Sequence, residues 1–222
     1  MTGIATLASG SYGVDTNAKL TAQSAQSLRA ATYEGQVIDF VARYVSIGPA
    51  APGDITSQEL DAILGAGLAL LLVQHVRFPG WVPSGAQGAT DGAHAAQNAS
   101  AAGYPQTAHI AFDLEGVAPG TSADAVAAHA NEWSAAVVGA GYQAMLYVGY
   151  NAILTPQQLY DLPNFNRYWS DFGERQVAVR GFCMKQLAGT TQFPGVPFGI
   201  DPDRIMPDAK GDLPTWAQAQ TS

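Results

Sequence analysis

The segment AHIAFDLEG places two carboxylates, Asp113 and Glu115, at the end of a short apolar run. Side chains alternate in direction along a strand, so residues two positions apart point to the same side. Burial and like charge would raise the pKa of one acid and leave the other ionised. Glycosidases use such a pair, one acid protonating the leaving oxygen and one carboxylate stabilising or attacking the sugar. On this segment alone, a strand ending in two solvated acids is an equally good interpretation.

Two further acids, Asp15 in SYGVD and Asp201 in FGIDPDRI, are predicted to end the first and last strands of the chain. In an α/β barrel the active site gathers at the carboxyl ends of the strands, and the first and eighth strands are neighbours. Taken singly, each of these acids is better explained as a turn or cap residue. Together with Asp113 and Glu115, they predict four acids converging on one cavity.

Aromatic and amide side chains near the strand ends are candidates for binding a sugar. Flat aromatic faces cover the apolar faces of sugar rings, and amides and hydroxyls bind sugar hydroxyls. Trp81 is the preferred platform because it lies in the Gly- and Pro-rich segment 77–88, where core packing explains it poorly. Core packing is the better explanation for Tyr147 and an equal one for Trp169. The candidate substrate-binding residues are Tyr44, Gln74, Trp81, Tyr147, Trp169 and Gln186.

Apolar runs alternate with Ala-rich helical stretches along the whole chain, which predicts an α/β protein. Strands are expected at about 11–15, 37–46, 68–76, 109–115, 144–150, 165–172, 181–188 and 198–205. Helices are expected at about 21–31, 56–66, 90–102 and 122–140, with a short one from 155. We therefore predict one domain over 1–222, a (β/α)₈ TIM barrel with its core at about 12–205 and shortened helices in the C-terminal half.

A doubly wound open sheet is the alternative to the barrel, but the turn after the first strand, VDTNAKL, lacks the glycines that bind phosphate in that fold. The last residues, 212–222, are predicted to be a surface helix or a frayed tail.

Composition limits the partners. The chain has 222 residues, of which 47% are hydrophobic and 13% charged. This length and apolar content are enough to form one sizeable core. A net charge of −8 argues against nucleic acid and favours an uncharged or weakly charged polymer. The longest aliphatic run, 68–76, is too short to span a membrane. We also expect the protein to be a monomer. The amino terminus lacks the basic region of a signal peptide. We expect synthesis in the cytoplasm and action at the cell wall, through non-classical secretion, phage release or incorporation in a virion.

Other chemistries fit less well. Cys183 is the one cysteine, so an intrachain disulfide and a thiolate cluster are excluded, and its apolar neighbours predict a structural thiol. The four histidines have no metal-ligand spacing, and neither a Gly-x-Ser-x-Gly elbow nor a phosphate loop is present. We expect no metal and no cofactor.

The strand motifs GVD, FDLE, YWSD, KQLAG and GIDPDRI resemble the family 25 glycoside hydrolases, lysozymes that cut peptidoglycan. They are more similar still to a sister group, the glycoside-hydrolase-like TIM barrels of unknown function found in actinobacteria and their phages. The helix TDGAHAAQNASAAGYP strengthens this second resemblance, which covers about 12–205. The sequence departs from the lysozyme pattern at Asp171 and Phe172, and at Pro202 and Asp203, where an asparagine is common.

The resemblance implies a retaining mechanism in which Glu115 is the general acid, Asp113 the stabilising carboxylate, and Asp15 and Asp201 supporting acids. It suggests a lysozyme- or muramidase-like enzyme that degrades peptidoglycan, as a phage endolysin or a wall-remodelling enzyme. The alternative is a non-catalytic glycan- or cell-wall-binding TIM-barrel module of a virion or cell envelope. A glycosidase acting on another polysaccharide is the third hypothesis.

Overall fold

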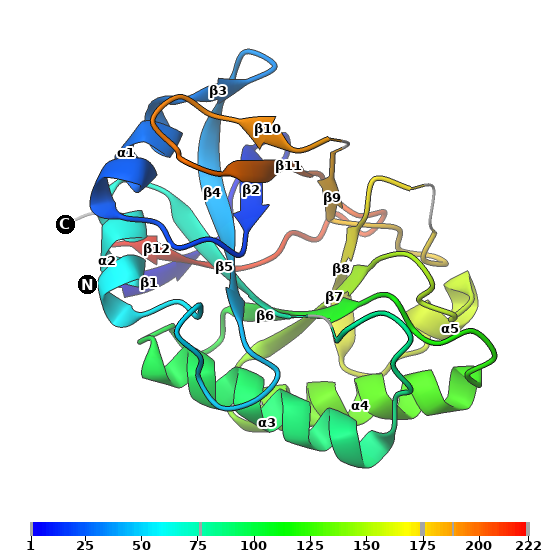
Figure 1. Cartoon of the computed structure of the whole chain (residues 1–222). Helices are drawn as coiled ribbons and strands as arrows, with labels where there is room; N and C mark the ends of the chain where they lie inside the picture. The colour runs from blue at the N-terminus through cyan, green and yellow to red at the C-terminus, as the bar shows by residue number, and fades with distance from the viewer. Residues whose placement is uncertain (1, 76, 174–175, 188, 221–222) are drawn as a thin grey trace.

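The computed structural model describes residues 2–75, 77–173, 176–187 and 189–220, so Val76 and Ala188, which end two predicted strands, lie outside it. Eight strands form a closed barrel in which each pairs with the next and the last with the first (Figure 1). Around the barrel they are β2 (Tyr12–Thr16), β4 (Gln36–Val45), β5 (Ala69–Gln74), β6 (His109–Leu114), β7 (Gln143–Val148), β8 (Phe165–Ser170), β9 (Met184–Gln186) and β11 (Gly199–Ile205). The predicted single-domain α/β barrel is confirmed.

Strand β11 differs from the prediction because it runs antiparallel to both of its neighbours, β9 and β2. Asp201 pairs with Asp15 in this register, near the amino end of β11 and not at its carboxyl end. The reversal still places Asp201 at the barrel end where the parallel strands finish. A parallel strand needs a long crossover, whereas the described part of the β9–β11 connection holds only the short strand β10 (Thr191–Gln192), paired with β11.

Five helices are described, and the side chain of a Ser or Thr caps the amino terminus of each. They are α1 (Ala22–Ala30), α2 (Ser57–Gly65), α3 (Gly85–Ala101), α4 (Ala123–Gly139) and α5 (Pro156–Tyr160). Helix α3 begins five residues before the predicted start at Thr90, because Ser84 accepts a hydrogen bond from the Gln87 backbone. The described residues after α5 contain no further helix, in line with the predicted shortening.

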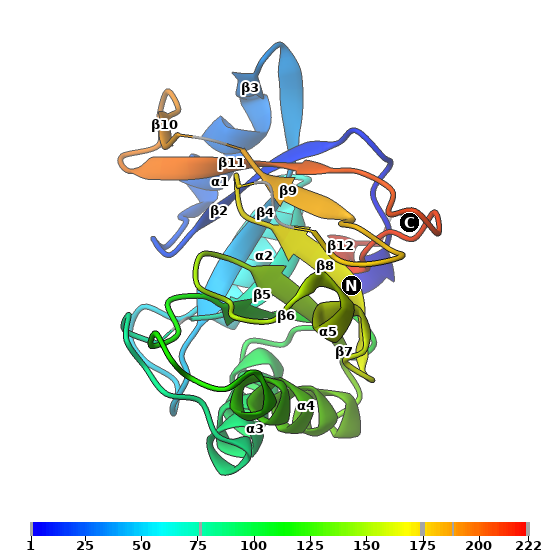
Figure 2. The same cartoon turned by 90° about the vertical axis from the view of Figure 1, so that its right-hand side faces the viewer.

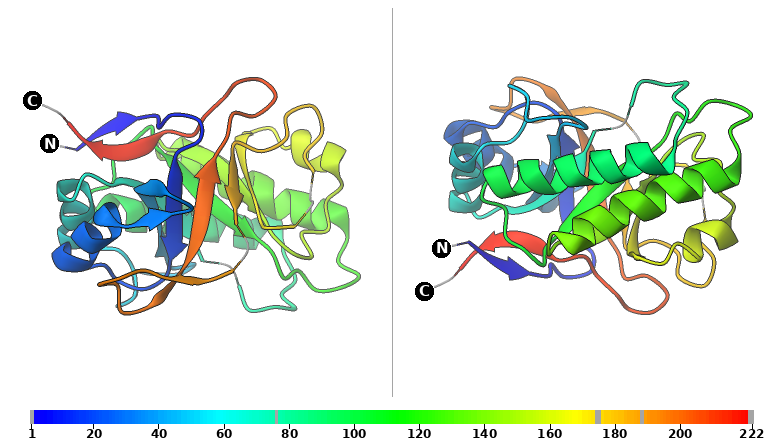
Figure 3. Two further views of the ribbon diagram at one scale, coloured as in Figure 1. Left: turned by 90° about the horizontal axis from the view of Figure 1, so that it is seen from above. Right: turned by 90° about the horizontal axis from the view of Figure 1, so that it is seen from below.

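Helices α3 and α4 pack as a close pair beneath β6 and β7 (Figures 1 and 3). Gly88 and Gly92 of α3 make this approach possible. A Cβ atom on Gly88 would overlap the His129 carbonyl group, with its carbon 2.8 Å away, and one on Gly92 would lie 2.9 Å from Trp133 Cα. Backbone therefore meets backbone where the helices cross.

The core has two layers, one between the strands and the helices and one inside the barrel. Leu71 and Val73 of β5 point into the barrel, while Leu70 and Leu72 point toward the helices. Cys183 is fully buried inside the barrel, where burial raises the pKa of its thiol to about 12. The predicted structural role of this cysteine is confirmed.

Two strands that pair with each other outside the barrel contradict the prediction for the C-terminal residues. β12 (Trp216–Ala219) pairs with β1 (Thr2–Ala5) and, through Ala217, with Leu70 at the start of β5. The predicted surface helix or frayed tail is therefore wrong for residues 212–220, while 221–222 lie outside the described residues. Trp216 of β12 is fully buried against Phe40, 4.8 Å away between ring centroids. A further small strand, β3 (Thr32–Tyr33), pairs with β4 and projects from the barrel (Figure 2).

No helix in the described ranges has both the length and the apolar character needed to cross a membrane.

Candidate active site

A cavity of about 260 Å³ opens at the end of the barrel where the parallel strands finish. It is lined by Asp15, Thr16, Asn17, Tyr44, His75, Asp113, Glu115, Thr190, Gly199 and Asp201. The four acids predicted from the sequence are therefore brought together, from β2, the end of β6 and β11. His75, Asn17 and Thr190 complete the wall and were not among the predicted residues.

The pair Asp113 and Glu115 sits at the end of β6, with Asp113 largely buried and Glu115 partly exposed. The Glu115 side chain lies against Gly149, where an added Cβ would be 2.6 Å from Glu115 Cβ. Two backbone hydrogen bonds fix the segment, from Gly149 to the Leu114 carbonyl (3.0 Å) and from Gly116 to the Tyr150 carbonyl (2.8 Å). The i and i+2 spacing thus directs both acids into one cavity.

Trp81 holds the same segment from the other side. Its indole N–H donates a 2.8 Å hydrogen bond to the backbone carbonyl of Glu115, and its ring packs edge-on against His129. Arg77 and Asp91 form an ion pair of 2.6 Å at the start of this loop. Trp81 does not line the cavity, so the structure gives it a place beside Glu115, while its predicted role as a sugar platform stays a prediction.

Asp15 is held in one orientation by two donors. The Tyr44 hydroxyl donates to Oδ1 (2.9 Å) and the Gln186 amide to Oδ2 (2.8 Å), while the Tyr147 hydroxyl donates to Gln186 Oε1 (2.9 Å). Burial raises the pKa of Asp15 to about 7, and the charge of Asp201 adds to this, against the two hydrogen bonds. Asp15 is therefore an acid that titrates near neutral pH.

Strand β11 contributes a second acid, Asp203, one of the positions where the sequence departs from the lysozyme pattern. It is fully buried below the cavity, and the Trp169 indole donates to its Oδ1 (3.0 Å). Asp201, above it, accepts a 2.7 Å hydrogen bond from the Thr190 hydroxyl. The two acids have the i and i+2 spacing of Asp113 and Glu115, a signal that could have found Asp203.

Two predicted substrate-binding residues are corrected. Gln74 points outward from the barrel and is fully buried, donating to the Asp91 carbonyl (2.7 Å) and accepting from the Trp133 indole (2.6 Å). Trp169 lies inside the barrel with 1% of its surface exposed. Neither side chain reaches the cavity. Tyr44 lines it, and Tyr147 and Gln186 support Asp15 from below.

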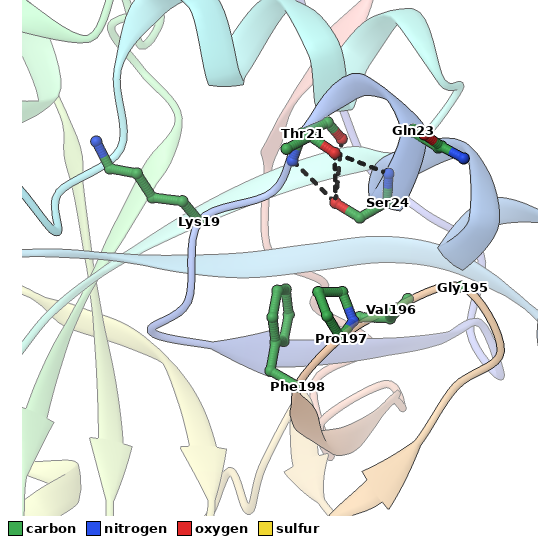
Figure 4. A pocket seen from close by; sticks show the side chains of 8 residues that line it. All are labelled: Lys19, Thr21, Gln23, Ser24, Gly195, Val196, Pro197 and Phe198. Carbon is green, nitrogen blue, oxygen red and sulfur yellow. Dashed lines mark hydrogen bonds between the residues drawn. The ribbon is translucent and has the colours of Figure 1, made fainter.

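A larger hollow of about 490 Å³ lies between the start of α1 and the segment 195–198 (Figure 4). Thr21 and Ser24 line it, and their hydroxyls are already used in capping α1 (Figure 4). Pro197 and Phe198 form its opposite wall. Its lining residues include no acid, whereas four acids line the smaller cavity. Among the described side chains, no group of three or more His, Cys, Asp or Glu is placed to hold a metal ion.

The closed α/β barrel, with carboxylates gathered at one end, has the fold that is also seen in a solved lysozyme and a solved endolysin. Residues 26–205 match the family model described as "Rv2525c-like, glycoside hydrolase-like domain", and the chain belongs to this family. Comparison with curated proteins gave no match.

Solved structures show the same fold at low sequence identity. The Tat-secreted protein Rv2525c of Mycobacterium tuberculosis, in complex with L-tartrate, has a TM-score of 0.65 at 14% identity, over 92% of this chain and 99% of that one. The lysozyme of Streptomyces coelicolor has a TM-score of 0.59 at 15% identity, over 91% and 94%. The modular autolysin LytC of Streptococcus pneumoniae, in complex with a synthetic peptidoglycan ligand, has a TM-score of 0.56 at 11% identity, over 87% and 46%.

Proposed function

We propose that this protein is a peptidoglycan-degrading glycoside hydrolase of the lysozyme or muramidase type that acts at the cell wall. The observation that carries this proposal is the convergence of Asp15, Asp113, Glu115 and Asp201 on one cavity. Two proteins with the same fold support action at the cell wall, because Rv2525c is Tat-secreted and LytC was solved with a peptidoglycan ligand. A phage endolysin and a wall-remodelling enzyme are both compatible with this site.

In the proposed reaction Glu115 is the general acid and protonates the glycosidic oxygen as the bond to the anomeric carbon breaks. Asp113, which is largely buried, acts as the carboxylate that stabilises the positive charge developing on the sugar ring. The sugar's own acetamido oxygen serves as the nucleophile at the anomeric carbon. Glu115 then takes a proton from the water that completes the hydrolysis. Asp15 and Asp201 orient the sugar, beside the hydroxyl and amide groups of Tyr44, Asn17 and Thr190.

Dye release from purified, dye-labelled cell walls tests the enzyme proposal. Glu115→Gln keeps the shape of the side chain and removes its acidic proton, so release should fall by about 10²- to 10⁴-fold. The matched control is Glu132→Gln, an exposed residue of α4 away from the cavity, which should release dye like the unmodified protein. If the unmodified protein and Glu115→Gln release equally little from walls of several bacterial classes, the enzyme proposal is wrong.

A non-catalytic glycan-binding module is the second candidate, favoured by exposed aromatic rings on loops at the cavity end. Phe78 is 93% exposed, Phe172 65% and Tyr150 42%. Such rings bind sugar faces without any chemistry. This candidate predicts peptidoglycan pull-down that survives Glu115→Gln and weakens when Trp81 or Phe78 is changed to Ala. Mass spectrometry of the products from a panel of glycans distinguishes a glycosidase that acts on another polysaccharide from the peptidoglycan hydrolase and from the non-catalytic module.

A further inference from the structure

Asp203 is an acid in a place where an ionised carboxylate is poorly solvated. Its exposed fraction is zero, and it faces the barrel interior from β11. Oδ1 accepts a hydrogen bond from the Trp169 indole, but among the described residues no N–H or O–H group donates to Oδ2. Water cannot reach this oxygen, and burying a charged oxygen without a donor is strongly unfavourable. A carboxyl group in such a place is more stable with its proton than without it.

The register of the sheet brings Asp203 next to Asp15. On the antiparallel pair β11 and β2, Asp201 is opposite Asp15 and Asp203 is opposite Gly13, which makes Asp203 the diagonal neighbour of Asp15 on the inner face. The two carboxyl groups are within hydrogen-bonding reach of each other. Gln186, opposite Asp203 on β9, already donates to Asp15 Oδ2. A protonated Asp203 would supply a third donor, after Tyr44 and Gln186.

The described groups that face this pair carry no positive charge that would stabilise a second carboxylate. Asp201 faces it from β11, Tyr44 from β4 and Tyr147 from β7, and Asp113 and Glu115 lie across the cavity at the end of β6.

Arg204 follows Asp203 in the chain and pairs with Lys185 on β9, but strand alternation turns both side chains outward, and Arg204 lies over the Tyr12 ring. Among the described residues that line the cavity, none is Lys or Arg, and the one base is His75. Burial lowers the pKa of His75 below its ordinary value, which favours the neutral imidazole.

We propose that Asp203 is a positioning residue that stays protonated in the folded protein at neutral pH and donates a hydrogen bond to the Asp15 carboxylate. The shared proton places a single negative charge at the cavity floor when Asp15 ionises, and it fixes the orientation of that charge. The effect on turnover rests on the proposed function, whereas the protonation itself does not.

The direction of the pKa shifts agrees with this arrangement. Burial raises the pKa of Asp203 well above its ordinary value, and the charge of Asp15 raises it further. Asp15, with a pKa raised to about 7, loses its proton first. The pair therefore titrates as a unit, with Asp15 as the group that ionises near neutral pH. Because the folded pKa of Asp203 lies above its unfolded value, its contribution to stability is present at low pH and is lost as pH rises through the folded pKa.

Two variants separate proton donation from packing. In Asp203→Asn the amide oxygen can accept from Trp169 and the amide NH₂ can donate to Asp15, so this variant imitates the protonated acid. Asp203→Leu has a similar size and no donor. We expect Asp203→Asn to lose less thermal stability than the unmodified protein as pH rises from about 7 to 9, because one titrating group is gone. Asp15 should titrate at lower pH in Asp203→Asn than in Asp203→Leu, as followed by ¹³C NMR of labelled aspartate.

Infrared spectroscopy of the unmodified protein tests whether a buried carboxylic acid keeps its proton, and this test does not depend on the folding of a variant. At about pH 8.5 Asp15 is ionised, and a C=O stretch of one protonated, buried carboxylic acid should remain. It should be absent from Asp203→Asn where that variant folds. The absence of this band from the unmodified protein, or equal Asp15 titration in the Asn and Leu variants, would overturn the proposal. These readouts use no substrate, so they stand apart from the dye-release result. If the enzyme is active, Asp203→Asn should shift the pH profile of kcat while keeping most of its maximum.

Discussion

The contact between Gly149 and Glu115 makes a sharp prediction about Gly149→Ala. Gly149 follows β7 directly, and its backbone N–H donates to the Leu114 carbonyl (3.0 Å). A methyl group here would lie 2.6 Å from Glu115 Cβ and 2.9 Å from Tyr147 Cε1, and would overlap Glu115 Oε2. Carbon atoms in contact prefer about 3.5–4.0 Å, so Glu115 Cβ must move by about 1 Å. Because Cβ is attached to the main chain, the backbone at Glu115 must move with it.

The size of the effect follows from that displacement. Overpacking at a buried contact costs about 1–3 kcal/mol, which lowers Tm by roughly 2–12 °C in a domain of this length. A 1 Å displacement of a catalytic group costs on the order of 10²-fold in turnover, so dye release should fall by about that factor. The control is Gly139→Ala at the end of α4, where no atom lies within 4 Å of the added methyl. It should be neutral or slightly stabilising, by up to about 1 kcal/mol.

Thermal unfolding and dye release, measured on both variants in parallel, check the prediction. If Gly149→Ala matches the unmodified protein in Tm and in dye release, the Glu115 side chain does not lie over Gly149 and the described geometry of the acid is wrong. A normal Tm with reduced release would show that the fold accommodates the displacement and that the position of Glu115 is what changes.

Two further predictions concern stability. Gly88→Ala should force α3 and α4 apart and lower the free energy of unfolding by about 1–3 kcal/mol, whereas Gly65→Ala, with open space around it, should not; equal urea midpoints for the two variants would contradict the close helix approach. Burial, aided by the charges of Arg167 and Arg77 respectively, lowers the pKa of His109 and His129 to about 4. Their contribution to stability is therefore present above about pH 6.5 and lost as pH falls toward 4. Imidazole NMR signals that titrate near pH 6.5 in the folded protein would refute this.

The alternation of side chains along a strand accounts for most of the site that could be predicted. It correctly directed Asp113 and Glu115 to one cavity, and it applies equally to Asp201 and Asp203. It failed for Gln74, because β5 is buried on both faces and its apolar run shows no alternation that would distinguish inside from outside. The partner that turns Gln74 outward, Trp133, is 59 residues away in the chain.

The direction of β11 and the existence of β12 could not be read from local pattern. Both depend on pairing between distant segments, Asp201 with Asp15 and Ala217 with Leu70. A four-residue run such as WAQA is too short to show a periodicity of its own, so its strand conformation comes from pairing with β1 and β5. The absence of a predicted helix between the last two barrel strands was the one available sign of the reversal.

The pairing of β1 with β12 has a consequence for how the molecule can be presented to a surface. Both strands sit by the amino ends of β5 and β6, where Ala217 pairs with Leu70 and His109 bonds the Thr215 carbonyl, at the opposite end of the barrel from the cavity. The two ends of the chain emerge side by side there (Figures 1 and 3). An affinity tag, a bead linkage or a fused protein joined at either end would therefore leave the acidic cavity pointing away from the attachment, free to meet an insoluble polymer.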